Sequence, residues 1–150
     1  MSSLDRTPDA PRIVPTRDRK SVIVLDEALP PGDAANAAAI LGASLGHRVD
    51  ALVGPDARDA EGGRHAGIIT VPLPVLRADA AGVADVRRRA LERELLVVGF
   101  TELAASHGDH GEYLAALSAT EPGALAYRGV ALHGPRKAVN SVVGSLPLLR

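Results

Sequence analysis

The sequence predicts a single α/β domain built on a mixed β-sheet, and three observations carry this prediction. The chain has 150 residues, of which 46% are hydrophobic and 23% charged, values that suit one globular domain. Residues 21–25 form a continuous run rich in β-branched side chains, as expected of a strand covered on both faces. After this run, strand and helix signals alternate along the chain, and that order favours a sheet with helices packed on it.

The first predicted helix covers residues 33–45. Asp33 can cap its first turn, and Gly46 can end it. Strands are predicted next over residues 48–53 and 68–71. Between them lies a hydrophilic loop with two adjacent glycines, 62 and 63, which would allow two strands to be joined as a hairpin.

The second half of the chain contains the clearest helix signal, over residues 79–94, because apolar side chains recur there at helical spacing. Before it, Pro72 and Pro74 favour an extended backbone that cannot continue inside a central ladder. The remaining predicted elements are strands over 95–100 and 125–133 and helices over 112–118 and 136–143.

Composition excludes several classes of protein. The formal net charge of −1 removes the general attraction to nucleic acid that basic proteins show. The chain has no cysteine, so it offers neither a disulfide framework nor a thiol nucleophile. Residues 1–18 are polar, contain three prolines and lack the apolar stretch of a secretion signal, so we expect a flexible arm ahead of a domain over 19–150. No apolar run reaches the ~20 residues of a membrane span, and we expect a cytoplasmic protein without membrane contact.

Motifs for common cofactors are absent or misplaced. The pentapeptide over residues 42–46 fits G-x-S-x-G, but it closes a predicted helix instead of following a strand, which argues against a nucleophile elbow. Neither the Walker pattern nor G-x-G-x-x-G occurs, so neither ATP nor NAD is expected as a cofactor.

Four possible metal ligands fall within six residues: His107, Asp109, His110 and Glu112. Imidazole and carboxylate groups suit zinc and similar metals. The spacing of Asp109 and Glu112 is also that of a helix-capping pattern. We favour the cap and expect no metal site.

Asn36 is the one polar side chain in the apolar run from 34 to 41. It can form a local hydrogen bond in the first helical turn, or it can present its amide in a cleft at the junction of strand and helix. Both readings stay open. Asp26 ends the preceding strand at the same junction, where a carboxylate could act as a base or only solvate the turn.

The start of the last predicted helix carries two cations, Arg136 and Lys137, directly after Pro135. A helix N-terminus favours negative charge, so something should compensate for these cations. A bound anion would do so, and so would a nearby carboxylate.

Two segments, VIVLDEALPPGDAANAAAILGASLG over 22–46 and GVALHGPRKAVNSVVGSLPLL over 129–149, together with PLPVLRAD over 72–79, resemble a bacterial family called domain of unknown function two thousand. The resemblance covers residues 20–149. It implies a fold for this chain but no reaction.

That family is similar in fold to the archaeal and eukaryotic type of peptidyl-tRNA hydrolase, which implies a three-layer α/β/α domain with a mixed sheet. These hydrolases follow the first strand with Gly-Lys, then Ala-Ala-Gln and a His. Here Gly32 stands at the Gly and Asn36 ends a similar Ala-Ala-Asn, while Asp33 replaces the Lys and Ala39 stands where the His would fall. The resemblance implies tRNA as a possible partner, and Asn36 as the best residue of the cleft.

Three functional hypotheses follow. The first is a protein that binds a small anion in a cleft formed where the first and last helices begin, with Gly32, Asn36, Arg136 and Lys137 as ligand-binding residues. The second is a hydrolase of peptidyl-tRNA or a related N-acylated aminoacyl ester, with Asn36 and Asp26 as candidate catalytic residues. The third is a homodimeric interaction module that uses the Ala-rich first helix or the apolar segment over 145–149.

Overall fold

The computed structural model describes residues 17–150, and its centre is a four-stranded sheet. The strand order is β4 (Val75–Ala78), β1 (Arg19–Asp26), β6 (Tyr127–Pro135) and β5 (Leu96–Thr101). β1 runs parallel to β4, and β6 runs antiparallel to both β1 and β5. The predicted mixed sheet is therefore confirmed. The predicted arm over 1–18 falls, but for its last two residues, outside the described part of the chain.

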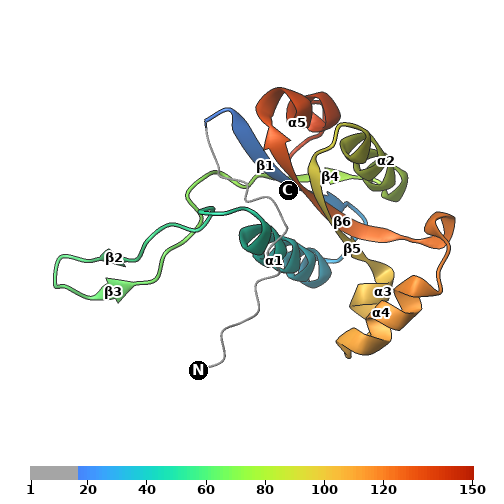
Figure 1. Ribbon diagram of the computed structural model, residues 1–150, viewed down its shortest axis with the longest axis horizontal. Helices are drawn as coiled ribbons and strands as arrows, with labels where there is room; N and C mark the ends of the chain where they lie inside the picture. Colours follow the sequence, from blue (N-terminus) through green and yellow to red (C-terminus); the bar gives the residue numbers. More distant parts are fainter. Residues whose placement is uncertain (1–16) are drawn as a thin grey trace.

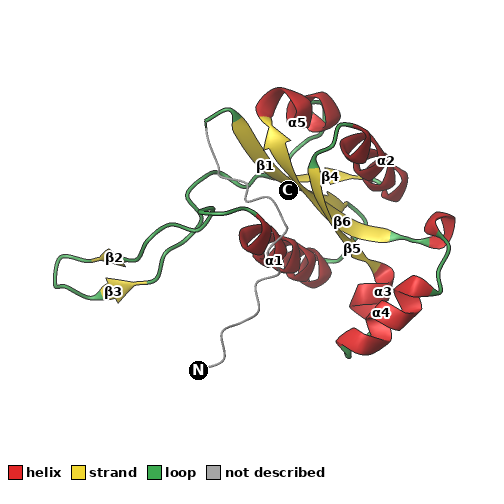
Figure 2. Cartoon of the chain, in the orientation of Figure 1, coloured by secondary structure: helices red, strands yellow, loops and turns green. Residues whose placement is uncertain are grey.

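Helices cover both faces of this sheet (Figures 1 and 2). α1 (Pro31–Arg48) packs on one face, against a core cluster that includes Ile23 and Leu25. α2 (Ala80–Glu92) and α5 (Arg136–Val143) pack on the other, against a cluster that includes Val22 and Val24. Because successive strand residues point to opposite faces and both faces are covered, the middle of β1, residues 22–25, is apolar at every position.

α2 and α5 begin within one residue of their predicted starts, whereas the helix predicted over 112–118 begins two residues earlier. The Asp79 carboxylate accepts a hydrogen bond from the backbone N–H of Gly82 at 2.7 Å and so caps α2. Asp109 accepts one from the N–H of Glu112 at 2.9 Å and so caps α4 (His110–Ser118). α5 has the predicted bounds. Two short elements that were not predicted, α3 (Glu102–Ser106) and a 3₁₀-helix over Pro122–Ala124, lie beside α4 in the chain.

The region after α1 differs from the prediction. The helix begins at Pro31 without a side-chain cap, so Asp33 is not its cap, and it continues through Gly46 to Arg48. The expected strands over 48–53 and 68–71 do not form, and only one isolated bridge joins Val53 to Ile69. The helix continues because its apolar face does: Leu45 and the next core residue along, Val49, are both buried.

β4 was not predicted as a strand, since two prolines precede it. It tolerates them because it begins after Pro74 and lies at the edge of the sheet. The carboxy-terminal segment covers that edge: the Arg77 N–H donates to the Pro147 carbonyl at 3.0 Å, and the Leu149 N–H donates to Val75 at 2.9 Å. Edge groups that would otherwise be open to another chain are thus paired within this one.

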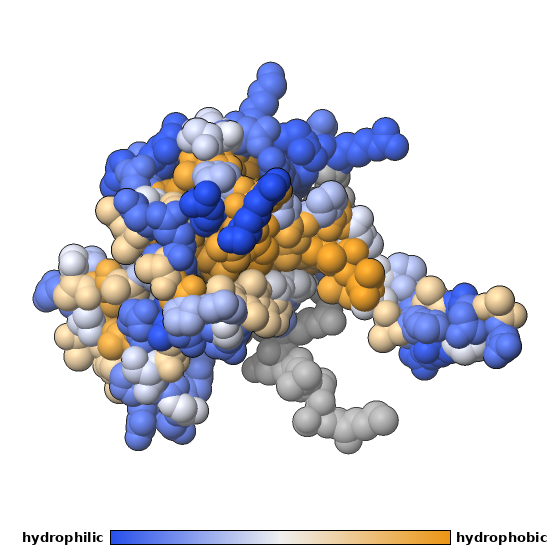
Figure 3. All heavy atoms as spheres, turned by 180° about the vertical axis from the view of Figure 1, so that it is seen from behind, coloured by the Kyte–Doolittle hydropathy of each residue, from blue (hydrophilic) through white to orange (hydrophobic). Residues whose placement is uncertain are grey.

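A hairpin does form around Gly62 and Gly63, but it is separate from the main sheet and uses strands other than the predicted ones. β2 (Ala57–Arg58) and β3 (Arg64–His65) pair only with each other. This hairpin arm projects from the body in Figure 1, and Figure 3 shows it from behind as largely hydrophilic. Gly62 adopts φ +85° in its turn, a conformation that favours glycine.

Among the helices of residues 17–150, none has the length and apolarity needed to cross a bilayer.

Candidate anion-binding site

The residues expected around the start of α1 lie at one end of the sheet. Asp26 ends β1, and its carboxylate accepts a hydrogen bond from the N–H of Ala28 at 3.0 Å. This bond lies in the turn that leads into the helix, and it shows that the Asp26 carboxylate pairs with the backbone of that turn. Gly32 and Asn36 are exposed on α1. Among residues 17–150, Asn36 has no side-chain hydrogen bond, so the local bond, one of the two alternatives for this residue, does not form.

Arg136 and Lys137 lie at the opposite end, which contradicts the predicted common cleft. In the antiparallel pair of β1 and β6, Arg19 is opposite Pro135. α5 therefore starts beside the beginning of β1, whereas α1 starts beyond its end. An eight-residue strand at about 3.3 Å per residue separates the two helix starts by roughly 20 Å or more, and the helices also pack on opposite faces. Asn36 cannot share a pocket with Arg136.

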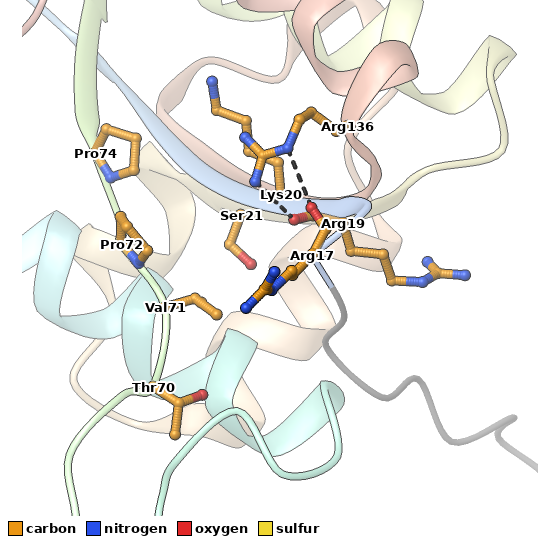
Figure 4. Close-up of a pocket in the computed structure, with 9 residues that line it drawn as sticks. All are labelled: Arg17, Arg19, Lys20, Ser21, Thr70, Val71, Pro72, Pro74 and Arg136. Atoms are coloured by element: carbon orange, nitrogen blue, oxygen red, sulfur yellow. Dashed lines mark hydrogen bonds between the residues drawn. The ribbon is translucent and has the colours of Figure 1, made fainter.

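A pocket of about 570 Å³ lies at the Arg136 end of the sheet. Of the nine described residues that line it, four are basic and none is acidic. Two of the basic residues, Arg19 and Lys20, begin β1, and Arg17 lies just before it. The facing wall is the irregular segment before β4 (Figure 4). The lining residues are Arg17, Arg19, Lys20, Ser21, Thr70, Val71, Pro72, Pro74 and Arg136.

Arg136 is fixed over the start of β1 by its contacts with the backbone. Its N–H donates to the carbonyl of Asp18 at 2.6 Å. Its Nε donates to the carbonyl of Arg17 at 3.3 Å, and its Nη2 to that of Arg19 at 3.4 Å. The charge of Arg136 is therefore held in one place. Lys137 is exposed and is not among the residues that line the pocket.

The other three cations contribute differently. In Figure 4 the Arg17 guanidinium points into the space beside Val71, while the Arg19 side chain extends away from it. Lys20 Nζ donates to Oδ1 of Asn140 on α5 at 2.9 Å. Within residues 17–150, no carboxylate forms an ion pair with any of the four, so the positive charge predicted at the start of α5 is not neutralised there by this part of the chain.

Ser21 and His133 form a buried polar pair at the wall of this pocket. They lie opposite each other on β1 and β6, and Ser21 Oγ is 2.7 Å from His133 Nδ1. Both residues are buried: Ser21 is 1% exposed and His133 is 2% exposed. Burial and the positive charge of Arg19 lower the pKa of His133, so the imidazole is neutral at pH 7.

Other candidate sites are weaker. No group of three or more His, Cys, Asp or Glu side chains in the described residues is arranged to hold a metal ion. Of the four possible ligands near α4, Asp109 is used as the helix cap. A second hollow of about 520 Å³ lies at the base of the hairpin arm, and His65 is the only ionisable residue among those lining it.

The sequence contains a basic run at this pocket that the prediction of the site did not use. The run RDRK over 17–20 crosses the predicted boundary between the arm and the domain, and three of its four residues are basic. Ser21 and His133 are polar positions next to apolar strand residues. Two such positions on neighbouring strands indicate a buried hydrogen-bonded pair once the register is known.

The fold and the site together describe an α/β protein with a basic pocket at one end of a mixed sheet. Over residues 19–150 the sequence matches the model of a family described as "Protein of unknown function (DUF2000)". The chain belongs to the DUF2000 family, and the resemblance given by its first and last segments is confirmed.

Comparison with solved structures adds the fold of a relative. The protein of unknown function Atu0240 from Agrobacterium tumefaciens strain C58 is similar with a TM-score of 0.82 and 22% sequence identity. The similarity covers 89% of this chain and 98% of that one. No protein of curated function matches the sequence. These comparisons support the fold and carry no reaction.

Proposed function

We propose that this protein binds a small anionic molecule in the basic pocket at the beginning of β1. The observation that carries the proposal is the composition of the lining, in which residues 17–150 supply four basic side chains and no acidic one. The protein as a whole is nearly neutral, so this concentration of positive charge is local. A hollow lined by one sign of charge attracts ligands of the opposite sign.

Arg17 and Arg136 are the groups best suited to contact such a ligand. Arg17 points into the hollow, and within residues 17–150 its guanidinium has no hydrogen-bond partner. A guanidinium offers several N–H donors in a planar fork that matches carboxylate and phosphate oxygens. Arg136 is already held in place, so less side-chain freedom is lost when a ligand binds.

The proposal keeps the anionic ligand of the sequence analysis and moves its site. Arg136 stays, Arg17 and Ser21 are added, and Asn36 and Gly32 belong to the other end of the sheet. Hydrolysis of an ester by Asn36 and Asp26 stays a prediction, because no contact of the described residues tests it.

The experiment is a calorimetric titration of the protein with inorganic phosphate and with 4-methylpentanoate. Arg17→Gln should weaken binding of both anions by about tenfold. Arg58→Gln, the same change of charge on the hairpin arm, and Asn36→Ala should leave the affinity unchanged. Equal affinity of wild type and Arg17→Gln, or loss on Asn36→Ala, would overturn the proposal.

A further inference from the structure

We propose that the Ser21 hydroxyl, held by His133, is a hydrogen-bond donor in the pocket and selects a compact, non-aromatic organic anion whose head carries only acceptor oxygens. This inference rests on the proposed function and names the ligand class of the same site. Two observations support it: which donors and acceptors of the buried Ser21–His133 pair have partners, and which residues form the pocket wall.

The position of the imidazole proton decides what Ser21 can do. A neutral imidazole carries one N–H, on Nδ1 or on Nε2. His133 Nε2 is buried and has no hydrogen-bond partner within the described residues. A proton there would be a buried donor without an acceptor, which is rarer in proteins than an unsatisfied acceptor. The proton therefore belongs on Nδ1, where it is donated to Ser21 Oγ at 2.7 Å.

This assignment leaves the hydroxyl hydrogen of Ser21 without a use. Its oxygen accepts from His133, and among residues 17–150 no other side chain or backbone group pairs with it. Ser21 lines the pocket, and Figure 4 shows its oxygen directed to the side where Arg17 and Val71 lie. The pocket thus gains a neutral donor beside its cations. A ligand atom that can only accept hydrogen bonds satisfies it, and an N–H group does not.

The opposite wall limits the body of the ligand. It consists of Val71, Pro72 and Pro74, with Thr70 below them. The Thr70 hydroxyl is already used, since it donates to the Leu52 carbonyl at 3.0 Å. No aromatic side chain lines the pocket, so a nucleobase would find no ring to stack on. An aliphatic body attached to a carboxylate or phosphate head fits this wall.

The experiment compares four probes by calorimetry: 4-methylpentanoate, the neutral 4-methylpentanamide, butyl phosphate and AMP. We expect both aliphatic anions to bind, the amide to bind at least tenfold more weakly, and AMP to bind no more tightly than butyl phosphate. Comparison of the affinities for 4-methylpentanoate and butyl phosphate shows whether the pocket prefers a carboxylate or a phosphate head. Tighter binding of AMP, or equal binding of the amide, would overturn the assignment of the ligand class.

Variants test Ser21 and its positioning residue. Ser21→Ala should weaken 4-methylpentanoate about tenfold, and Ser118→Ala, a matched control on α4, should not. His133→Leu should weaken binding similarly. His133→Asn keeps a nitrogen donor near the Nδ1 position and should restore most of the affinity. If His133 only filled space, the Asn variant would bind no better than the Leu variant. Wild-type affinity in Ser21→Ala would overturn the inference.

A measurement on the unaltered protein keeps the inference testable if a variant fails to fold. Long-range ¹H–¹⁵N spectra of the imidazole report which nitrogen carries the proton. We expect the Nδ1–H form, and an Nε2–H form would overturn the inference. If the anions bind and Arg17→Gln weakens them while Ser21→Ala does not, this inference fails and the proposed function stands. If no anion binds the wild type, the proposed function itself fails.

Discussion

Ser21 and His133 face each other across β1 and β6, and a hydrogen bond of 2.7 Å joins Oγ to Nδ1. The surrounding core is aliphatic. Within the described residues, the hydrogen bond between the two side chains is therefore what offsets the free-energy cost of burying them. The same pair lies where the sheet meets the basic pocket. One contact therefore links the stability of the two central strands to the chemistry of the site.

His133 predicts how stability depends on pH. Its pKa in the folded protein is below the ordinary value of 6.5, so the unfolded chain binds the proton more tightly. The stabilisation from the neutral imidazole is complete above pH 6.5 and is lost as the pH falls below it. Urea unfolding between pH 8 and 5 should show the free energy of unfolding decreasing by up to about 1.4 kcal/mol per pH unit below that point.

The control for this titration is His133→Asn, which removes the titrating group and keeps the hydrogen bond. Its stability should vary less over the same range. A variant with the same pH dependence as wild type would mean that groups other than His133 cause it.

Arg128 on β6 forms ion pairs with α1 and α3, and we expect these contacts to stabilise the fold. Its Nε is 2.9 Å from Glu102 Oε1 and its Nη1 is 3.4 Å from Asp33 Oδ1, with the Arg128 side chain only 20% exposed. Arg128→Met should cost about 1–2 kcal/mol in urea unfolding, because it leaves charged groups without their partner. Arg88 has two similar bridges but is 60% exposed, so Arg88→Met should cost less than about 0.5 kcal/mol. Equal costs would contradict this account.

Asp59 predicts local order in the hairpin arm. Its carboxylate accepts hydrogen bonds from the N–H groups of Glu61 and Gly63 and contacts His65. Asp59→Ala should speed amide exchange at Gly63 without changing the global unfolding temperature, since the arm pairs only with itself. Glu61→Ala should leave exchange unchanged.

The arm should also respond to acid. The contact with His65 and the backbone hydrogen bonds lower the pKa of Asp59 below 3.8. Its stabilising effect is therefore present above that pH and is lost as the pH falls further. Arm amides that stay protected in Asp59→Ala would show that the carboxylate does not organise the turn.

Leu149 predicts the role of the segment that covers β4. It packs against the core cluster on the α1 side, whereas Leu148 is 48% exposed. Leu149→Asp should destabilise by about 1–3 kcal/mol and release the segment from the edge of the sheet, exposing β4 to pairing between copies. Light scattering should then detect association. Leu148→Asp should remain like wild type, and association of wild type itself at the same concentration would favour the predicted homodimer instead.

Local signals in the sequence predicted much of the fold. Asp79 and Asp109 precede amphipathic or apolar segments at capping distance, and both cap helices in the structure. The run over 21–25 predicted a central strand because both of its faces are buried. β4 was missed because its strand character depends on its place at the edge of the sheet, which Pro72 and Pro74 do not reveal.

The candidate site depended on long-range arrangement, which residue patterns do not contain. Arg136 was identified because cations at a helix start call for compensation. Its pairing with Asn36 was wrong because the direction of β6 relative to β1 decides which helix starts meet. The buried partner, His133, lies 112 residues from Ser21 in the chain, and only the register of the two strands brings them together.

The most direct test of the anion pocket is an NMR titration of the isotope-labelled protein with 4-methylpentanoate, followed through the backbone amides. The account predicts that the largest shifts occur at residues 17–21, 70–75 and 133–136, with saturation at one stoichiometric site. Shifts centred on Gly32 and Asn36, or spread over the surface without saturation, would contradict it.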